Sequence, residues 1–317
     1  MGNNLMRRDI HYMQGIEVEE AVEIVRHCFF GDEEMQTNER IVRSVEEFQK
    51  QYHEMLNYWR YERCLAELYF ESQNTVFKYY GKCEVCNSMQ ALVVDYQGAE
   101  EHSGIKTPNW RERLTCPNCG CNSRQRFIAH AIFQRYEPGM KILMHEQKTH
   151  IFTGLQKELP TLEGFEYMGR DYVPGAYYDG VRYEDPGNCT YADEEFDIVI
   201  SSDVLELVPD YKAAFGETSR ILRPGGKFVF TVPFNANSVE TEIRARIKGD
   251  AIEFSGEPLY YPNPIEGYES LPVFHIFGWD ILKDLKDYGF KDACAKVYYG
   301  IKEGYLGYLP IYFEAQK

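Results

Sequence analysis

Long apolar runs are missing from this 317-residue chain, and so is any excess of positive charge. No stretch approaches the roughly 20 apolar residues that a membrane-spanning helix needs, and the amino terminus lacks the apolar segment of a signal peptide. Lys and Arg total 34, against 50 Asp and Glu, which gives a net charge of −16. Because basic side chains supply most nucleic-acid affinity, this charge disfavours a DNA or RNA partner. We expect a cytoplasmic protein without a membrane segment.

A disulfide framework is not expected either, because the nine cysteines are an odd number and no secretion signal accompanies them. Four of them form two pairs, each with two intervening residues: Cys83 with Cys86, and Cys116 with Cys119. Each pair can form a tight turn that directs two thiolates at one point, as in a tetrahedral Zn²⁺ site. We predict a structural zinc ribbon with these four ligands and with Cys121 as a bystander. The alternative is four buried or redox-active cysteines that share this spacing.

The first 80 residues have the periodicity of helices. Val18–Phe30 carries apolar residues at helical spacing and is followed by Gly31. Residues 37–71 contain no Gly or Pro and repeat apolar residues every three or four positions, which predicts one long amphipathic helix. Its acidic outer face is either solvated or part of a homodimer formed by the amino-terminal helices.

Beyond a Cys-rich and Gly-rich stretch, the pattern predicts a helix over residues 123–136 and then alternating short elements. We expect strands at 141–145, 165–169, 196–201 and 227–233, with helices at 150–159, 210–222 and 279–288. Strands separated by helices form a parallel sheet. We therefore predict three domains: a helical region (1–80), a zinc ribbon with its following helix (81–136) and an α/β domain (137–317).

The most informative run extends from Phe196 to Pro233. It contains a Phe-Asp strand that ends in small polar residues, then a Val-Leu-Glu-Leu-Val segment, a helix, and Leu-Arg-Pro-Gly-Gly before the next strand. This run closely resembles class I methyltransferases that use S-adenosylmethionine (SAM), although Leu207 stands where that family usually has His. The resemblance covers about residues 140 to 317. It implies a Rossmann-like α/β fold with a mostly parallel seven-stranded sheet, and SAM at the carboxyl ends of the strands.

The resemblance also implies a set of cofactor-binding residues. Asp171 matches the acid that accepts the ribose hydroxyls, and Asp185 matches the acid that accepts the adenine N6 amine; the alternative for each is a solvated loop carboxylate. Further residues expected at the cofactor are Tyr172, Glu184, Ser201, Ser202 and Asp203.

The first strand departs from the family pattern. The family has a Gly-x-Gly loop there, which lets the backbone approach the methionine part of SAM, but residues 141–150 contain no glycine. Either Glu146 and Thr149 bind the cofactor with side chains, or SAM affinity is lost. One of Arg124 and Arg126 is a further candidate, as a bidentate partner of the SAM carboxylate; the alternative is a solvated helical arginine.

The predicted function is methyl transfer from SAM to an O or N nucleophile of a small molecule or of a glycan or natural-product intermediate. A zinc ribbon before such a domain is similar to a bacterial subgroup linked to those pathways. His275 is the candidate general base, unless it packs between Phe274 and Trp279. Two rivals remain: an rRNA methyltransferase that reads RNA with its ribbon, and a non-catalytic scaffold or regulator with the SAM fold.

Overall fold

The computed structural model describes residues 18–30, 38–51, 60–62, 64–65, 76–102, 105–167, 172–263, 269–307 and 310–317. The chain forms two compact units. Unit 1 consists of Met1–Glu39, Lys50–Phe127 and Tyr298–Pro310, and unit 2 consists of Arg40–Gln49, Ile128–Val297 and Ile311–Lys317. Both units are discontinuous in sequence, and the three domains expected above remain a prediction.

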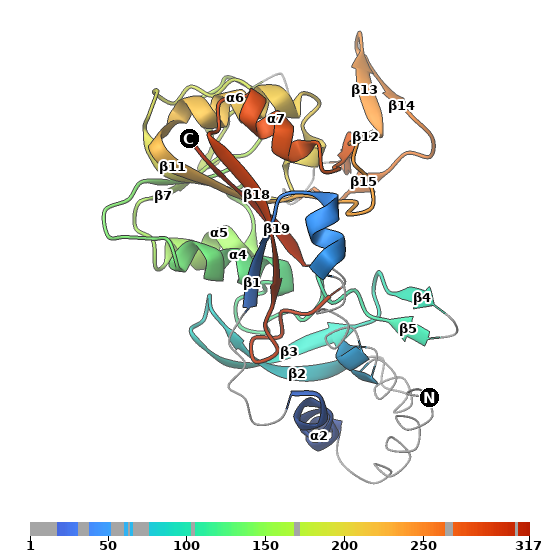
Figure 1. Cartoon of the computed structure of the whole chain (residues 1–317). Coiled ribbons are helices and arrows are strands. Elements are labelled where there is room, and N and C mark those ends of the chain that lie inside the picture. Colours follow the sequence, from blue (N-terminus) through green and yellow to red (C-terminus); the bar gives the residue numbers. More distant parts are fainter. Residues whose placement is uncertain are drawn as a thin grey trace. The chain divides into compact units, whose positions relative to one another are not determined.

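Unit 2 is built around a seven-stranded sheet (Figure 1). Its order is β1 (Asn38–Val42), β18 (Asp292–Tyr299), β19 (Ile311–Gln316), β11 (Leu222–Thr231), β10 (Phe196–Ser202), β6 (Ile142–Met144) and β7 (Leu162–Gly164). The neighbours β7, β6, β10 and β11 are parallel, whereas β19 runs antiparallel to both β11 and β18. The predicted Rossmann-like, mostly parallel seven-stranded sheet is thus confirmed.

Strand β10 lies in the interior of the sheet. All its residues except Asp197 are buried, as expected for a parallel strand covered on both faces. Ile198 pairs with Ile142 of β6 on one side and with Lys227 of β11 on the other. Aromatic side chains fill the adjacent core, and the rings of Phe228 and Phe230 stack 4.4 Å apart.

Some helices begin where the sequence supplies a capping group. In α6 (Tyr211–Ile221), the Asp210 carboxylate accepts the Ala213 N–H at 3.0 Å, which satisfies one of the unpaired donors at the helix start. The predicted helices are present as α2 (Val18–Phe30), α4 (Ser123–Phe133), α5 (His150–Gln156), α6 and α7 (Ile281–Asp287), and a 3-10 turn, η1 (Leu205–Leu207), follows β10. No helix among the described residues is both long enough and apolar enough to cross a membrane.

The remaining strands form hairpins and short ladders. Unit 1 contains the pairs β2 (Val76–Cys83) with β3 (Ser88–Asp95), and β4 (Glu100–His102) with β5 (Ile105–Thr107). Unit 2 adds β8 (Tyr177–Tyr178) with β9 (Val181–Arg182), β12 (Glu242–Ile243) with β17 (His275–Ile276), β13 (Ala245–Lys248) with β14 (Ala251–Phe254), and β15 (Tyr260–Tyr261) with β16 (Leu271–Pro272). The β13–β14 hairpin extends away from the sheet (Figure 1).

The prediction of one helix over residues 37–71 is wrong in its first part. Asn38–Val42 forms edge strand β1, and a helix begins only after Ser44. The Ser44 hydroxyl accepts the Glu47 N–H at 3.3 Å, while the Glu47 carboxylate accepts the Arg43 N–H at 2.8 Å. This reciprocal pattern resembles a capping box, which fixes a new helix start. Residues 52–59 and 66–75 lie outside the described part, and the homodimer stays a prediction.

Two strand boundaries also differ from the prediction. The second strand was expected at 165–169, of which 168 and 169 lie outside the described residues, and β7 instead covers Leu162–Gly164. Phe165 is apolar and buried, as expected of a strand residue, but it lies just beyond the end of β7. Strand β11 begins at Leu222 rather than 227, so Pro224, Gly225 and Gly226 belong to it. A register irregularity between Phe196 and Ile198 of β10 accommodates this glycine-rich segment.

Candidate cofactor site and metal centre

The carboxyl ends of β6 and β10 mark the point where the strand order reverses. From β6 the chain moves to β7 on one side and then returns to β10 on the other side. Ligands of open α/β sheets bind at such a switch point. The candidate cofactor site therefore lies beside the loop 145–148 after β6 and the residues that end β10.

Three predicted residues lie together at the end of β10. Ser201 and Ser202 are buried, and the Ser201 hydroxyl has no hydrogen-bond partner among the described residues. Asp203 follows with φ of +56° and donates its N–H to Thr231 O at 3.1 Å. A non-glycine residue in this left-handed region carries strain that is commonly retained at functional sites. The strand end thus combines buried polar groups with a strained carboxylate residue.

The loop after β6 leads directly into α5. Glu146 is 5% exposed at the start of this loop. Thr149 is the N-cap of α5, and its hydroxyl accepts the Phe152 N–H at 3.4 Å. The Thr149 side chain thus caps α5, and its predicted contact with the cofactor stays a prediction. Glu146 remains at the candidate site.

The predicted acids give a mixed result. Asp171 lies outside the described residues, so its role stays a prediction. Glu184 is fully buried, and its carboxylate accepts Arg182 Nη2 at 2.7 Å and the Thr190 hydroxyl at 2.6 Å. These contacts anchor Glu184 in the surrounding loop, and its predicted contact with the cofactor stays a prediction. Asp185 is half-buried, and its Oδ1 accepts the Gly187 N–H at 2.8 Å in a local turn.

Tyrosine rings gather beside these acids. The Tyr172 ring lies 4.8 Å from that of Tyr178 and 5.7 Å from that of Tyr183, while Tyr167 lies 5.9 Å from Tyr183. Aromatic faces of this kind can receive a planar ligand. Tyr172 is thus placed in an aromatic group, and its contact with the cofactor stays a prediction.

Arg124 and Arg126, at the start of α4, both have protein partners within unit 1. Arg124 pairs with Glu112 through two bonds, Nε to Oε1 at 2.9 Å and Nη2 to Oε2 at 3.1 Å. Arg126 is fully buried and donates to the carbonyls of Glu303 at 2.6 Å and Gly304 at 3.2 Å. Bidentate pairing and carbonyl contacts engage donors of both side chains, and the expectation that one of them binds the SAM carboxylate stays a prediction.

His275 lies in β17 and is 4% exposed. Its ring packs 4.8 Å from Tyr211 and 5.8 Å from Phe277, and Nε2 lies 3.2 Å from Pro209 O. A carbonyl only accepts, so Nε2 carries the proton in this contact. Burial lowers the pKa of His275. The placement favours a packing role that includes the expected Phe274, whose ring lies 6.3 Å from that of His275, and the base role stays an untested prediction.

Sequence reasoning missed two buried titratable residues near the switch point. His145 is 2% exposed, lies 5.2 Å from the Phe165 ring, and burial lowers its pKa to about 3. Glu166 is 7% exposed, and burial raises its pKa. A signal was available for Glu166, because an acidic residue between Phe165 and Tyr167 interrupts an apolar run.

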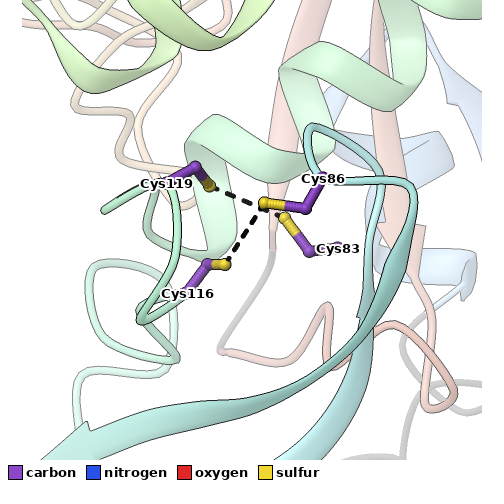
Figure 2. Close-up of side chains that lie close together, drawn as sticks. All are labelled: Cys83, Cys86, Cys116 and Cys119. Atoms are coloured by element: carbon purple, nitrogen blue, oxygen red, sulfur yellow. Dashed lines mark hydrogen bonds between the residues drawn. The ribbon is translucent and has the colours of Figure 1, made fainter.

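Unit 1 brings the two cysteine pairs together. The sulfur atoms of Cys83, Cys86, Cys116 and Cys119 all lie within 4.8 Å of one another (Figure 2). Cys83 Sγ is 3.7 Å from Cys119 Sγ, and Cys86 Sγ is 3.7 Å from Cys116 Sγ. Cys83 ends β2, Cys86 lies in the turn between β2 and β3, and the other pair precedes α4. Gly120, with φ of +75°, lets its N–H reach Cys116 O at 2.9 Å.

These distances fit a tetrahedral zinc site. With a Zn–S bond of about 2.3 Å, the edge of the sulfur tetrahedron is about 3.8 Å, close to both 3.7 Å separations. The Asn118 amide donates to Cys86 Sγ at 3.2 Å, a contact that supports a thiolate ligand. Cys121 is buried and contributes its carbonyl, which accepts the Cys116 N–H at 2.9 Å. The four thiols are thus able to hold one metal ion.

Comparison with known proteins adds a family match. Residues 169–230 match a family model described as a methyltransferase domain. A sarcosine/dimethylglycine N-methyltransferase of Halorhodospira halochloris is 34% identical over 84 residues, which are 26% of this chain and 30% of that protein. The chain thus matches less than a third of the length of this curated relative. A SAM-dependent methyltransferase structure from Mesorhizobium loti is 17% identical, with a TM-score of 0.38, and the match covers 60% of this chain and 97% of that one.

The matched residues coincide with the part of the sheet that the sequence motifs single out. They include β10, its strained carboxyl end, α6 and nearly all of β11. The strand order places these elements at the switch point where the family resemblance predicts the cofactor. These elements of the sheet-bearing part are thus similar to the methyltransferase domain that the family model describes.

Proposed function

We propose that this chain transfers a methyl group from SAM to a nucleophilic O or N atom of a small molecule or of a glycan or natural-product intermediate. The observation that carries the proposal is the methyltransferase-domain match over residues 169–230, which covers the end of β10 at the switch point. The net charge of −16 supports a small acceptor over an RNA.

The chain's own contribution to such a reaction is orientation. Bound SAM would supply a methyl group already activated by a positively charged sulfur. Asp171, Asp185, Glu146 and Asp203 are the residues that would hold it, with Ser201 and Ser202 at the strand end. Holding two reactants in line removes much of the entropic part of the barrier, so alignment alone accounts for a large rate enhancement.

Two observations favour a nitrogen atom over an oxygen atom as the methyl acceptor. A general base is needed only when the acceptor carries a proton of high pKa, and the buried His275, with its lowered pKa and its contact with Pro209, is poorly placed to take one. An amine that reaches the site in its neutral form needs no such base. The name of the matched relative, an N-methyltransferase of sarcosine and dimethylglycine, supports an amine acceptor.

We also propose that Cys83, Cys86, Cys116 and Cys119 hold one structural Zn²⁺. All four ligands come from the protein, which is the arrangement of a closed structural site. The metal would join the β2–β3 turn to the segment before α4. Unit 1 has a core of its own around these cysteines, and it includes Leu92, Trp110 and Leu306. Zinc would therefore add to an apolar core rather than replace one.

Two measurements test the methyltransferase proposal. Calorimetry with SAM and with S-adenosylhomocysteine is expected to show binding of both. Methyl-labelled SAM is then incubated with the protein and with the small-molecule, RNA and protein fractions of a cell extract. Label in the small-molecule fraction supports the proposal. Label in RNA would establish the rRNA rival, and SAM binding without transfer to any fraction would establish the regulator.

A matched pair of variants tests whether SAM binds at this site. Asp185→Asn keeps an oxygen for the Gly187 N–H but replaces the carboxylate with an amide, and we expect about tenfold weaker SAM binding, as for one charged hydrogen bond. Asp197→Asn is the control, because Asp197 lies at the opposite, amino end of β10 and accepts the Lys141 N–H at 2.7 Å. Equal affinities in the two variants would remove Asp185 from the site.

A further inference from the structure

The glycine-free loop after β6 is held by a carboxylate. The backbone N–H groups of Gln147 and Lys148 both donate to Glu166 Oε1, each at 2.7 Å. Glu166 follows β7 and is 7% exposed. Two short bonds converging on one carboxylate oxygen are charge-assisted and stronger than bonds between neutral groups. They fix the backbone of the loop at the switch point.

The same loop is also tied to the β8–β9 hairpin. The Gln147 side chain accepts the Arg182 N–H at 3.2 Å and donates to Gly180 O at 3.3 Å. Glu166 itself donates its N–H to Arg182 O at 2.9 Å. The loop, the end of β7 and β9 therefore form one hydrogen-bonded group around Glu166, all within unit 2.

A close backbone approach completes this arrangement. Gly164 ends β7, and a Cβ atom there would lie 2.9 Å from Glu146 O and 2.4 Å from Phe152 Cε2. A side chain at position 164 would thus push against the loop and the first turn of α5. The glycine that the loop lacks is present instead on the neighbouring strand, where it lets β7 approach the loop.

Burying a carboxylate is costly unless hydrogen bonds compensate it. Burial raises the pKa of Glu166, and the two loop N–H groups oppose that rise. The Gln147 and Lys148 N–H groups, in turn, donate to the protein itself. In the family pattern a glycine-rich backbone meets the methionine part of SAM at this place, so this chain holds the corresponding segment by a different means.

We propose that Glu166 is a positioning residue for the cofactor: it fixes residues 146–148 in the conformation against which the amino-acid part of SAM binds, and Gly164 provides the space for this. The inference rests on the proposed SAM-dependent function. It names Glu166 as acting through the loop, without contact with the cofactor.

Binding of two ligands to three variants tests it. S-adenosylhomocysteine carries the amino-acid part, whereas methylthioadenosine lacks it. Calorimetry of Glu166→Ala is expected to show at least tenfold weaker binding of S-adenosylhomocysteine, with methylthioadenosine affinity within twofold of the parent. Glu166→Gln retains an acceptor oxygen for the two N–H groups and is expected to recover most of the loss. Asp197→Asn, which removes a similar backbone-binding carboxylate at the other end of the strands, is expected to bind both ligands normally.

The outcomes separate this inference from the proposed function. A parent protein that binds neither ligand would overturn the methyltransferase proposal. Equal losses for both ligands would show that Glu166 only supports the fold, and unchanged binding of S-adenosylhomocysteine would remove it altogether. If Glu166→Ala does not fold, Gly164→Ala displaces the same loop from the opposite side and should weaken S-adenosylhomocysteine selectively. Normal binding of S-adenosylhomocysteine by Gly164→Ala would then overturn the inference.

Discussion

Glu314 on β19 is surrounded by three cations within unit 2. Its carboxylate lies 2.6 Å from Arg135 Nε, 2.9 Å from Lys227 Nζ and 3.1 Å from Lys296 Nζ, and its side chain is 12% exposed. Burial alone would raise the pKa of Glu314, but the cations outweigh burial and lower it to about 2. Replacement of this carboxylate by an amide, in Glu314→Gln, would leave the three cations without their shared partner.

The sign and size of the effect follow from linkage. A carboxyl group has a pKa of about 4.3 in an unfolded chain, so the lowered folded value stabilises the protein above that pH and the benefit disappears as pH falls towards 2. The full contribution is about 3 kcal/mol at pH 7. About 0.6 kcal/mol of it is lost at pH 4, and about 1.7 kcal/mol at pH 3.

Urea unfolding of the parent and of Glu314→Gln at pH 7, 5 and 4 measures this contribution. We expect the variant to be less stable by about 3 kcal/mol at pH 7, with the difference narrowing towards acid. Glu253→Gln serves as the control, because Glu253 is 63% exposed and its pair with Lys248 spans 3.4 Å, so its removal should change stability by less than about 0.5 kcal/mol. A loss below about 1 kcal/mol for Glu314→Gln, or a difference that does not narrow at pH 4, would refute the reasoning.

Three further predictions concern the sites. The purified protein should contain one Zn²⁺ by metal analysis. Cys116→Ser should lose the metal and with it up to about 10 kcal/mol of binding free energy, whereas Cys121→Ser should keep it. A metal-free parent protein, or a Cys116→Ser variant as stable as the parent, contradicts this prediction. Asp171→Ala should weaken SAM binding by about 2 kcal/mol, and unchanged affinity in calorimetry would exclude Asp171. His275→Asn should bind SAM normally and lose less than about tenfold in turnover, whereas a loss of about 10²-fold with SAM binding intact would restore His275 as the base.

Much of the fold was predictable because its signals are local. The helix Val18–Phe30 was predicted with its observed bounds, since an apolar stripe marks one face of the helix and the following glycine marks its end. The strand at Asn38–Val42 was missed, because its pairing partner β18 lies at the other end of the chain. The spacing Ser44 to Glu47 was a readable sign that a helix starts there and not earlier.

The residues of the candidate sites likewise differ in whether the local sequence predicts their contacts. The two cysteine pairs are each encoded within four residues, and the structure brings their sulfurs together. Arg124 was the opposite case: nothing in the local sequence indicated that Glu112 would engage it. Glu166 likewise acts on a loop that precedes it by 18 and 19 residues in sequence. Side-chain partners of this kind depend on tertiary packing, which short patterns do not encode.

The discontinuity of unit 1 has a consequence during synthesis. The cysteine pairs and α4 emerge early, but Ile301 and Leu306, which belong to the same apolar core, and the carbonyls that receive Arg126 are made only after nearly the whole of unit 2. At about 5 to 20 residues per second, this interval is on the order of 10 to 30 s. During it, the nascent chain carries four closely spaced thiols without their complete apolar cover. Early capture of a metal ion would protect these sulfurs from oxidation until the last strands are made.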